Sequence, residues 1–273
     1  MQMSAHVTPV TTPIPPMAPT AVPGTLTDDA FLGGRLQILQ PEKGYRAGID
    51  AVFLAAAIPC VDGDKLFEAG IGTGVAALCV IARNPTVYVT GIEVASRHAL
   101  LCEENAKRNG FAHCLRVIHA DVKDAMRKDL AEFPRHGTFN HAFANPPYFD
   151  EVKSTPSPYL LKAHAHAFGP EDLEMWIKVM YTVLMPRGTV TIVNRAETLG
   201  KLLASMENRF GDIRIAPLHA RQGAAASRVV VQGVRGSKAP MQLLPGLILH
   251  GEASGFTADA DAVLREGSAW RLR

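Results

Sequence analysis

The sequence predicts an α/β fold built on a mainly parallel sheet, with helices on both faces and an antiparallel hairpin at the C-terminal end of the sheet. From residue 65 onward, short apolar runs of strand character alternate with longer helical patterns, which is typical of strand–helix–strand units. Further along, two strand patterns follow each other with no helix between them, which favours a hairpin. Together these patterns predict a seven-stranded sheet.

The N-terminal part has a different character. Residues 1–25 contain six prolines and no Asp, Glu, Lys or Arg, a composition that predicts a disordered or polyproline-II arm. Residues 31–39 predict a short strand pair around a Gly-Gly sequence. Residues 49–58 predict a helix whose N-cap region includes Asp50.

Strand and helix patterns then alternate through the rest of the chain. Ser96 is expected to cap one helix and Gly110 to stop it, and a Pro-Arg-Gly sequence at 186–188 ends another. The predicted strands cover residues 65–68, 87–94, 115–120, 139–144 and 189–194, with 213–218 and 228–234 as the hairpin. The predicted helices cover residues 75–83, 96–109, 124–132, 171–184 and 196–208. We expect one domain over residues 26–240 and a C-terminal extension over 241–273, packed on the domain or trailing it.

Composition and charge are those of a soluble globular protein. Hydrophobic residues make up 47% and charged residues 20% of the 273 residues. The net charge of +2 is compatible with a polyanionic partner but does not by itself indicate one. The four cysteines have neither CxxC nor Cys/His ligand spacing, so we expect reduced thiols and no metal site. No apolar run approaches the ~18–20 residues of a membrane span, and no signal peptide is recognisable, so we expect a cytoplasmic protein without a membrane partner.

The sequence Asn145-Pro146-Pro147-Tyr148 follows the predicted strand over 139–144. The prolines fix φ and have no N–H, so this loop is stiff and offers acceptors rather than donors. The side-chain carbonyl of Asn145 and the main-chain carbonyl of Pro146 can accept both hydrogens of an –NH₂ group, and Tyr148 can stack on the ring that carries the amine. The pattern therefore favours recognition of a planar amine, the alternative being a proline-stiffened loop without chemistry.

A glycine-rich loop separates the first strand and the first helix of the alternating region. Its glycines, Gly70, Gly72 and Gly74, are spaced G-x-G-x-G, and Glu68 stands two positions before the first of them. This is where a doubly wound sheet binds nucleotides, because glycines let a ligand approach the backbone at the electropositive start of a helix. The dinucleotide fingerprint would need glycine at Val75, so the spacing favours a cofactor without a pyrophosphate.

Two further acids end the next two predicted strands. Glu93 lies about twenty residues beyond the glycine loop, where a carboxylate commonly accepts from both ribose hydroxyls. Asp121 can accept from the exocyclic amine of adenine, and Val122 can supply a backbone contact to the same ring. Each acid alone could be a helix cap. Acids at three successive strand ends, together with the two loops, favour one shared binding site.

This ordered set of motifs resembles the class I S-adenosylmethionine-dependent methyltransferases, over roughly residues 28–240. The resemblance implies a Rossmann-like fold, S-adenosyl-L-methionine as cofactor, and methyl transfer to a planar nitrogen such as adenine N6, guanine N2 or a glutamine amide. More specifically, residues 44–52 (GYRAGIDAV), 228–232 (RVVVQ) and 236–240 (GSKAP) are similar to the bacterial enzymes that methylate N6 of adenine 37 in valine tRNA. The resemblance therefore implies tRNA as the partner.

The expected site combines these motifs. The resemblance implies that the region from Arg46 to Asp50 packs over the cofactor. Between Gly211 and His250 the sequence contains five Lys or Arg residues and a single acid, Asp212. This excess of positive charge suits either an RNA-facing surface or ordinary strand-surface charges. These basic residues are Arg214, Arg221, Arg228, Arg235 and Lys238. The expected cofactor-binding residues are Arg46, Asp50, Glu68, Gly70, Gly72, Gly74, Glu93, Asp121, Val122 and Asn145. The expected catalytic residues are Asn145, Pro146 and Tyr148, and the expected substrate-binding residues are Pro147, Tyr148, Arg221 and Arg228.

Other functions are considered beside this one. Release-factor glutamine-N5 methyltransferases usually carry a helical domain ahead of the glycine loop, and guanine-N2 RNA methyltransferases typically have Phe at the position of Tyr148. A nicotinamide oxidoreductase is disfavoured by Val75, and a non-catalytic binding module by the intact Asn145. No catalytic histidine is expected, because the methylated amine can lose its proton to water. His164 and His166 could cover the pocket or contact RNA, but exposed histidines without such a role are commoner.

Overall fold

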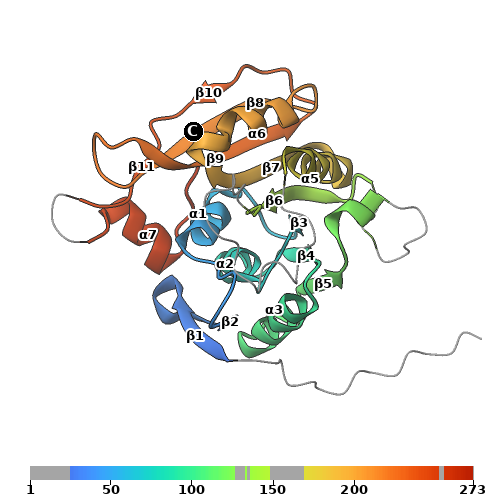
Figure 1. The fold of residues 1–273 in the computed structure, drawn as a ribbon, viewed down its shortest axis with the longest axis vertical. Coiled ribbons are helices and arrows are strands. Elements are labelled where there is room, and N and C mark those ends of the chain that lie inside the picture. The colour runs from blue at the N-terminus through green and yellow to red at the C-terminus, as the bar shows by residue number, and fades with distance from the viewer. Residues whose placement is uncertain (1–24, 127–132, 134–135, 148–168, 252–254, 273) are drawn as a thin grey trace, which may run out of the picture.

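The computed structural model describes residues 25–126, 133, 136–147, 169–251 and 255–272. A central sheet carries helices on both faces, and a separate two-stranded hairpin from the N-terminal part packs beside α2 (Val75–Arg83) and α3 (Ser96–Arg108) (Figure 1). The predicted fold class, an α/β architecture with a mainly parallel sheet and an antiparallel hairpin, is confirmed.

The central sheet contains nine strands within the described residues. They are β3 (Lys65–Ala69), β4 (Tyr88–Glu93), β5 (Leu115–His119), β6 (Phe139–Ala144), β7 (Leu184–Arg195), β8 (Phe210–His219), β9 (Ala226–Arg235), β10 (Gln242–Leu243) and β11 (Leu247–Ile248). Their order across the sheet is β10-β8-β9-β7-β6-β3-β4-β5, and β11 also pairs with β8. Strands β3 to β7 pair in parallel, whereas β9 is antiparallel to both β7 and β8.

The helices divide between the two faces of the sheet. One face carries α2, α3, α1 (Ile49–Ala57) and α7 (Ala258–Glu266), and the other carries α5 (Pro170–Val183) and α6 (Leu199–Met206). Side chains of β7 alternate between the faces: Ile192 packs with α5 and α6, and Val193 packs with α1 and α2. Because both faces are covered, most side chains of the central strands are apolar, as expected for a parallel sheet, although β3 and β6 also carry Glu68 and His141.

Several predicted elements differ in detail. The seven predicted strands are present, but β10 and β11 were missed, since two-residue strands carry no periodic pattern. Ala95, not Ser96, is the N-cap residue of α3, and no side chain caps this helix. The helix predicted over 124–132 begins as a 3₁₀ turn, η2 (Val122–Met126), and its remainder includes residues outside the described ones.

β7 begins five residues earlier than predicted because it contains an irregularity. Leu184 pairs with Phe139, but the next pair along is Thr189 with His141, so extra residues are accommodated on β7. Arg187 has a φ of 69° at this point. Such a bulge tolerates Pro186 inside the strand, where a regular ladder would not.

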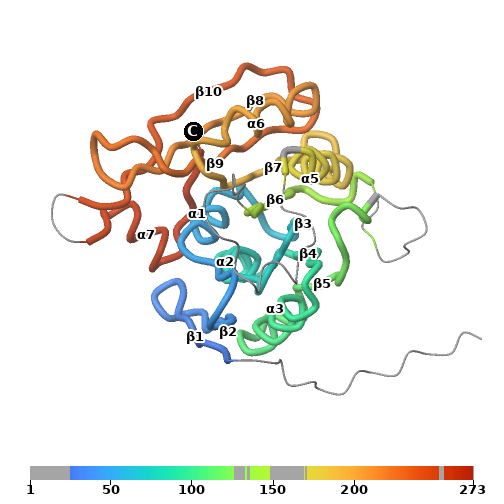
Figure 2. Tube along the Cα trace, viewed as in Figure 1, coloured from blue at the N-terminus to red at the C-terminus, as the bar shows by residue number. Residues whose placement is uncertain are grey.

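The C-terminal segment packs onto the rest of the fold. β10 and β11 extend the sheet beside β8, and α7 lies against α1 and against η1 (Leu32–Gly34) (Figure 2). The main-chain N–H of Trp270 donates to the Ala56 carbonyl over 2.8 Å, and the Trp270 ring meets Phe53 edge-on. Leu272 is 4% exposed. Among the described residues, no helix combines the length and the apolarity needed to cross a membrane.

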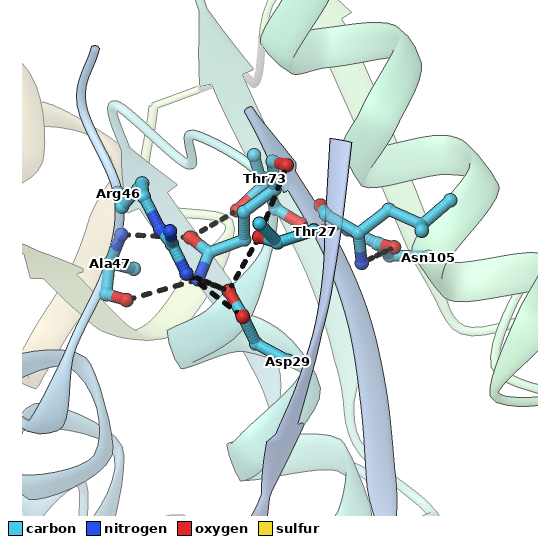
Figure 3. Close-up of polar contacts among 8 residues, drawn as sticks. Thr27, Asp29, Arg46, Ala47, Thr73 and Asn105 are labelled. Carbon is cyan, nitrogen blue, oxygen red and sulfur yellow. Dashed lines mark hydrogen bonds and ion pairs between the residues drawn. The ribbon is translucent and has the colours of Figure 1, made fainter. Parts of the chain in front are cut away.

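A buried asparagine of α3 joins the N-terminal hairpin to the glycine loop. The hairpin consists of β1 (Leu26–Phe31) and β2 (Leu36–Pro41), longer than predicted. Asn105 is fully buried, and its side chain bonds to both main-chain groups of Leu39 over 2.8 and 3.0 Å. Its Nδ2 also donates to the Thr73 carbonyl over 2.9 Å. Asn105 therefore fixes the loop relative to β2 (Figure 3).

Gln40 makes a second connection on the same hairpin. Its Oε1 accepts from the Ala47 N–H over 2.8 Å and from the Thr73 hydroxyl over 3.4 Å. Its Nε2 donates to Asp29 over 2.8 Å, and Asp29 in turn pairs with Arg46 over 2.7 Å (Figure 3). Gln40 is 1% exposed, so these bonds are made in a low dielectric, where polar groups need their partners.

Asn105→Ala should destabilise the fold and loosen the glycine loop. It leaves buried main-chain groups of Leu39 and Thr73 without a partner, which costs about 1–3 kcal/mol. Urea unfolding measures the stability, and amide hydrogen exchange at Gly72 and Gly74 measures the opening of the loop.

Asn109→Ala is the matched control, because Asn109 holds the hairpin through both main-chain groups of Gln37. It should lower stability without accelerating exchange in the glycine loop. Equal exchange rates in the two variants would contradict the role assigned to Asn105.

A row of hydrogen-bonded polar side chains is buried near the amino-terminal ends of β3 and β6. His141 Nε2 lies 3.0 Å from Asp64 Oδ2, and His141 Nδ1 lies 2.7 Å from the Thr189 hydroxyl. Asp64 also accepts from the Val61 N–H over 2.8 Å. Burial lowers the pKa of His141 and outweighs the neighbouring Asp64 carboxylate, which raises it. His141 is therefore held neutral in the folded protein.

This lowered pKa should make stability depend on pH. In the unfolded chain a histidine takes up a proton near pH ~6.5, whereas folded His141 resists protonation. The stability that neutral His141 contributes is thus present above ~6.5 and is lost as the pH falls through the lowered pKa of the folded state. Urea unfolding at about pH 7.5 and about pH 5 should show a smaller loss for His141→Gln than for the wild type. His113→Gln, at an exposed position, should follow the wild type, and a His141→Gln curve parallel to both would refute the assignment.

Candidate active site

Two loops that follow neighbouring strands meet at the carboxyl edge of the sheet. β3 and β6 pair in parallel, with Ala69 opposite Ala144, so Gly70 and Asn145 leave the sheet side by side. The carboxyl edge of such sheets is where ligands bind in open α/β folds. The glycine loop and the Asn-Pro-Pro loop are therefore brought together as the motifs predict.

A pocket lies between these loops and the start of α1, and its open space, bulk solvent at the mouth included, is about 260 Å³. Four predicted site residues line it: Glu68, Gly70, Gly72 and Asn145. The other lining residues are Tyr45, Ala47, Ala51, Ile71, Thr73, Val75 and Ala76. Tyr45 and Ala47 lie within the GYRAGIDAV sequence, which was the available signal for them, but neither was predicted as a site residue.

The three glycines of the loop all have a positive φ, but they differ in what an added side chain would meet. Their φ angles are +69°, +57° and +88° at Gly70, Gly72 and Gly74. A Cβ on Gly70 would lie 2.4 Å from the Trp176 ring, and one on Gly74 would lie 2.6 Å from Cys102 Sγ. A Cβ on Gly72 would meet only Tyr45, at 3.7 Å. Packing behind the loop therefore excludes side chains at two positions, and Gly72 is the one with room on its pocket side.

Glu93 holds the glycine loop. Its Oε2 accepts from the Gly72 N–H over 2.9 Å, and its Oε1 accepts from the Ala95 N–H over 2.8 Å. The side chain is 7% exposed, so these are buried charge-assisted hydrogen bonds. A carboxylate has about four acceptor sites, so the expected contact to ribose hydroxyls is compatible with this arrangement.

Glu68 is a buried carboxylate whose hydrogen bonds are incomplete. It is 3% exposed, and its Oε2 finds no hydrogen-bond partner in the structure of the described residues. Burial raises the pKa of Glu68, the charge of Glu93 raises it further, and a backbone hydrogen bond from Ala77 lowers it. Buried acceptors are nearly always paired, so an unpaired one in a pocket indicates a place for a ligand donor.

Asn145 lies at the rim of the pocket. Its Nδ2 donates to the Tyr45 hydroxyl over 3.4 Å. Pro146 is buried and Pro147 is exposed. Tyr148, His164 and His166 lie outside the described residues.

The remaining predicted residues do not line this pocket. Arg46 pairs with Asp29, and Asp50 pairs with Arg228 over 2.9 Å. Asp121 accepts from the Lys123 N–H, and Val122 is buried against the cluster that contains α5.

The predicted basic segment does not form one continuous surface. Arg235 donates to the Leu184 carbonyl and lies over the Tyr181 ring, and Arg214 pairs with Asp212. Arg228 and Arg221, which donates to the Gly251 carbonyl, belong to the edge of the sheet where β8 ends and β9 begins.

Arg195 lies at this same edge. It ends β7 directly opposite Arg228, with Glu197 3.3 Å from its guanidinium. Within the described residues, no group of three or more His, Cys, Asp or Glu side chains is arranged to hold a metal ion.

Curated proteins described as tRNA1(Val) (adenine(37)-N6)-methyltransferases are similar to this chain. No protein-family model matches the chain. A tRNA1(Val) (adenine(37)-N6)-methyltransferase of a Flavobacteriaceae bacterium is 33% identical over 116 residues, which cover 42% of this chain and 47% of that protein. The chain thus spans about half the length of this relative. A protein of the same description from Actinobacillus succinogenes is 24% identical over 244 residues, covering 87% of this chain and 96% of that one.

Solved structures share the fold. A protein from Agrobacterium tumefaciens, described as a predicted O-methyltransferase, superposes with a TM-score of 0.67 at 24% identity, covering 81% of this chain and 98% of that one. A SAM-dependent O-methyltransferase from Thermotoga maritima superposes with a TM-score of 0.51 at 14% identity, covering 72% and 68%. The chain therefore has the Rossmann-like fold of the class I methyltransferases and resembles the tRNA1(Val) adenine(37)-N6-methyltransferases in sequence, which confirms the resemblance seen in its motifs.

Proposed function

We propose that this protein is an S-adenosylmethionine-dependent methyltransferase that modifies N6 of an adenine in tRNA, the anticodon-loop adenine of valine tRNA by similarity to its relatives. One observation carries the proposal: Asn145 lines the same pocket as the glycine loop and the unpaired carboxylate of Glu68. An acceptor for an amine thus lies beside a place for a cationic cofactor.

The residues present fit S-adenosylmethionine, which would supply an electrophilic methyl group on a sulfonium centre. Glu68 Oε2 is a buried acceptor in need of a donor, and an amino group of the cofactor would meet that need. Gly72 leaves space on the pocket side, and Glu93 retains acceptor capacity for hydroxyls. The amino end of α2 follows the loop and favours a carboxylate.

The Asn-Pro-Pro loop would orient the amine to be methylated. Asn145 Oδ1 and the Pro146 carbonyl would accept its two hydrogens and direct the nitrogen lone pair toward the pocket. Positive charge develops on nitrogen as the C–N bond forms, so these acceptors bind the transition state more strongly than the neutral amine. The base must leave its stack to reach the loop, which suits an adenine in an RNA loop.

A transfer assay with labelled S-adenosylmethionine tests the proposal. Unmodified valine tRNA, release factor and duplex DNA are offered separately, and the labelled nucleosides or residues are identified. Label recovered as N6-methyladenosine in tRNA supports the proposal. Label only in release factor would move the substrate to a glutamine amide, and no label in any acceptor would refute methyl transfer to these substrates.

Asn145→Ala should abolish most of the turnover and hardly change cofactor affinity, because the contact of Asn145 with the cofactor would be only one among those of the glycine loop and its acids. Loss of a hydrogen bond to a group that gains charge costs ~1.5–3 kcal/mol, which corresponds to roughly ten- to a hundredfold in kcat. Steady-state kinetics and calorimetric titration of the cofactor measure the two effects. Asn140→Ala is the control, because Asn140 lies at the amino-terminal end of the same strand, away from the pocket. It should keep the wild-type kcat. A collapse of cofactor affinity with turnover intact would overturn the role of Asn145.

Glu68→Gln should raise stability near neutral pH and weaken cofactor binding. Because the folded-state pKa of Glu68 is raised, the wild type loses stability as the pH rises from the unfolded-state value of about 4.3 through that raised pKa. The neutral Gln avoids this loss, so the advantage of the variant should shrink as the pH falls towards ~4.3.

Thermal unfolding near neutral pH and near pH ~4.3 measures the effect of Glu68→Gln on stability, and calorimetry measures its effect on cofactor binding. The expected loss of cofactor affinity is roughly ten- to a hundredfold. Glu104→Gln, at an exposed position of α3, is the control and should change neither quantity. A Glu68→Gln protein that is less stable near neutral pH and binds the cofactor normally would contradict the assignment.

A further inference from the structure

Tyr45 contacts both loops of the pocket. Its Cε1 lies 3.7 Å from the place that a Cβ on Gly72 would occupy. Its hydroxyl accepts from Asn145 Nδ2 over 3.4 Å. Its ring meets His98 of α3 edge-on, with 6.3 Å between the ring centroids. The side chain thus bridges the glycine loop and the residue that would bind the target amine.

Packing alone does not account for Tyr45 at this position. The side chain is 43% exposed, whereas the core aromatics Phe53 and Phe67 are fully buried. A ring exposed to this degree gains only part of the stabilisation that burial provides. The specific contact that Tyr45 makes with the catalytic candidate is through its hydroxyl.

That contact bears on which end of the Asn145 amide faces the substrate. An asparagine amide has a donor end, Nδ2, and an acceptor end, Oδ1. Here Nδ2 is bonded to the Tyr45 hydroxyl, so Oδ1 is the end turned away from it. An amine substrate needs the acceptor end, because an NH₂ group of asparagine facing another NH₂ group would oppose two donors.

We propose that Tyr45 is a positioning residue for methyl transfer, whose hydroxyl holds the Asn145 amide with Oδ1 toward the amine that is methylated. This inference rests on the proposed function of the same site. It assigns Tyr45 a role in turnover, and not in binding the cofactor. It also predicts that Tyr45 acts only through Asn145.

Tyr45→Phe removes only the hydroxyl and tests the proposal. The expected result is an about three- to tenfold fall in kcat, with the KM for tRNA, the cofactor affinity and the thermal midpoint unchanged. Tyr88→Phe, an exposed tyrosine at the start of β4 on the opposite edge of the sheet, is the matched control and should keep the wild-type kcat. Wild-type kcat in Tyr45→Phe overturns the proposal.

A double variant separates positioning from an independent effect. Adding Tyr45→Phe to Asn145→Ala should reduce kcat no further, because the residue through which Tyr45 acts is already absent. A further loss equal to that of Tyr45→Phe alone would show that the two residues act independently, and would overturn the proposal.

A measurement without turnover tests the contact itself. The side-chain amide signals of Asn145 in a ¹⁵N–¹H spectrum are identified by their absence from Asn145→Ala. They should shift in Tyr45→Phe and not in Tyr88→Phe, and unmoved signals in Tyr45→Phe overturn the proposal. If the signals shift in Tyr45→Phe but the wild type methylates no acceptor, the contact is established, whereas the proposed function and the positioning role with it are refuted.

Discussion

The site depends on hydrogen bonds that hold the glycine loop from outside. Gly70, Gly72 and Gly74 all adopt left-handed backbone angles, a conformation that forms no regular ladder of its own. Glu93 accepts from the Gly72 N–H, and Asn105 donates to the Thr73 carbonyl. Both side chains are buried, so the loop between strand and helix is fixed by polar groups in a low dielectric, where each bond is strong and each missing partner is costly.

The strand that leads into this loop, β3, carries an unfavourable group. Glu68 is buried with one oxygen unpaired, close enough to Glu93 for the second charge to raise its pKa. Stability alone would favour a neutral side chain at this position, because an unpaired buried charge is penalised. Local features that lower stability tend to be kept where binding or catalysis needs them. The cost at Glu68 and its place in the pocket both agree with the cofactor-binding role proposed for this residue.

Regular elements were predictable because their signals are local and repeated. The alternation of strands and helices follows from hydrophobic periodicity, and it defined all strands from β3 to β9. The bulge in β7, the two-residue strands β10 and β11, and the cap of α3 were not predictable, since each depends on pairing with a distant segment or on one backbone angle. Asp50 and Arg228 illustrate the same limit, because their ion pair joins residues 178 positions apart.

By itself, the sequence determined the order of the motifs and therefore where they gather. Loops that follow parallel strands emerge at one edge of the sheet, so Gly70 and Asn145 were expected at the same edge, and the pairing of β3 with β6 makes them neighbours there. Only the tertiary structure decided which partners the polar side chains take. Arg46 pairs with Asp29, Glu93 holds the loop, and Tyr45 bonds to Asn145. Chain order governs where strands end, but a hydrogen bond forms with whichever group folding brings within about 3 Å, and no local pattern in the sequence records that distance.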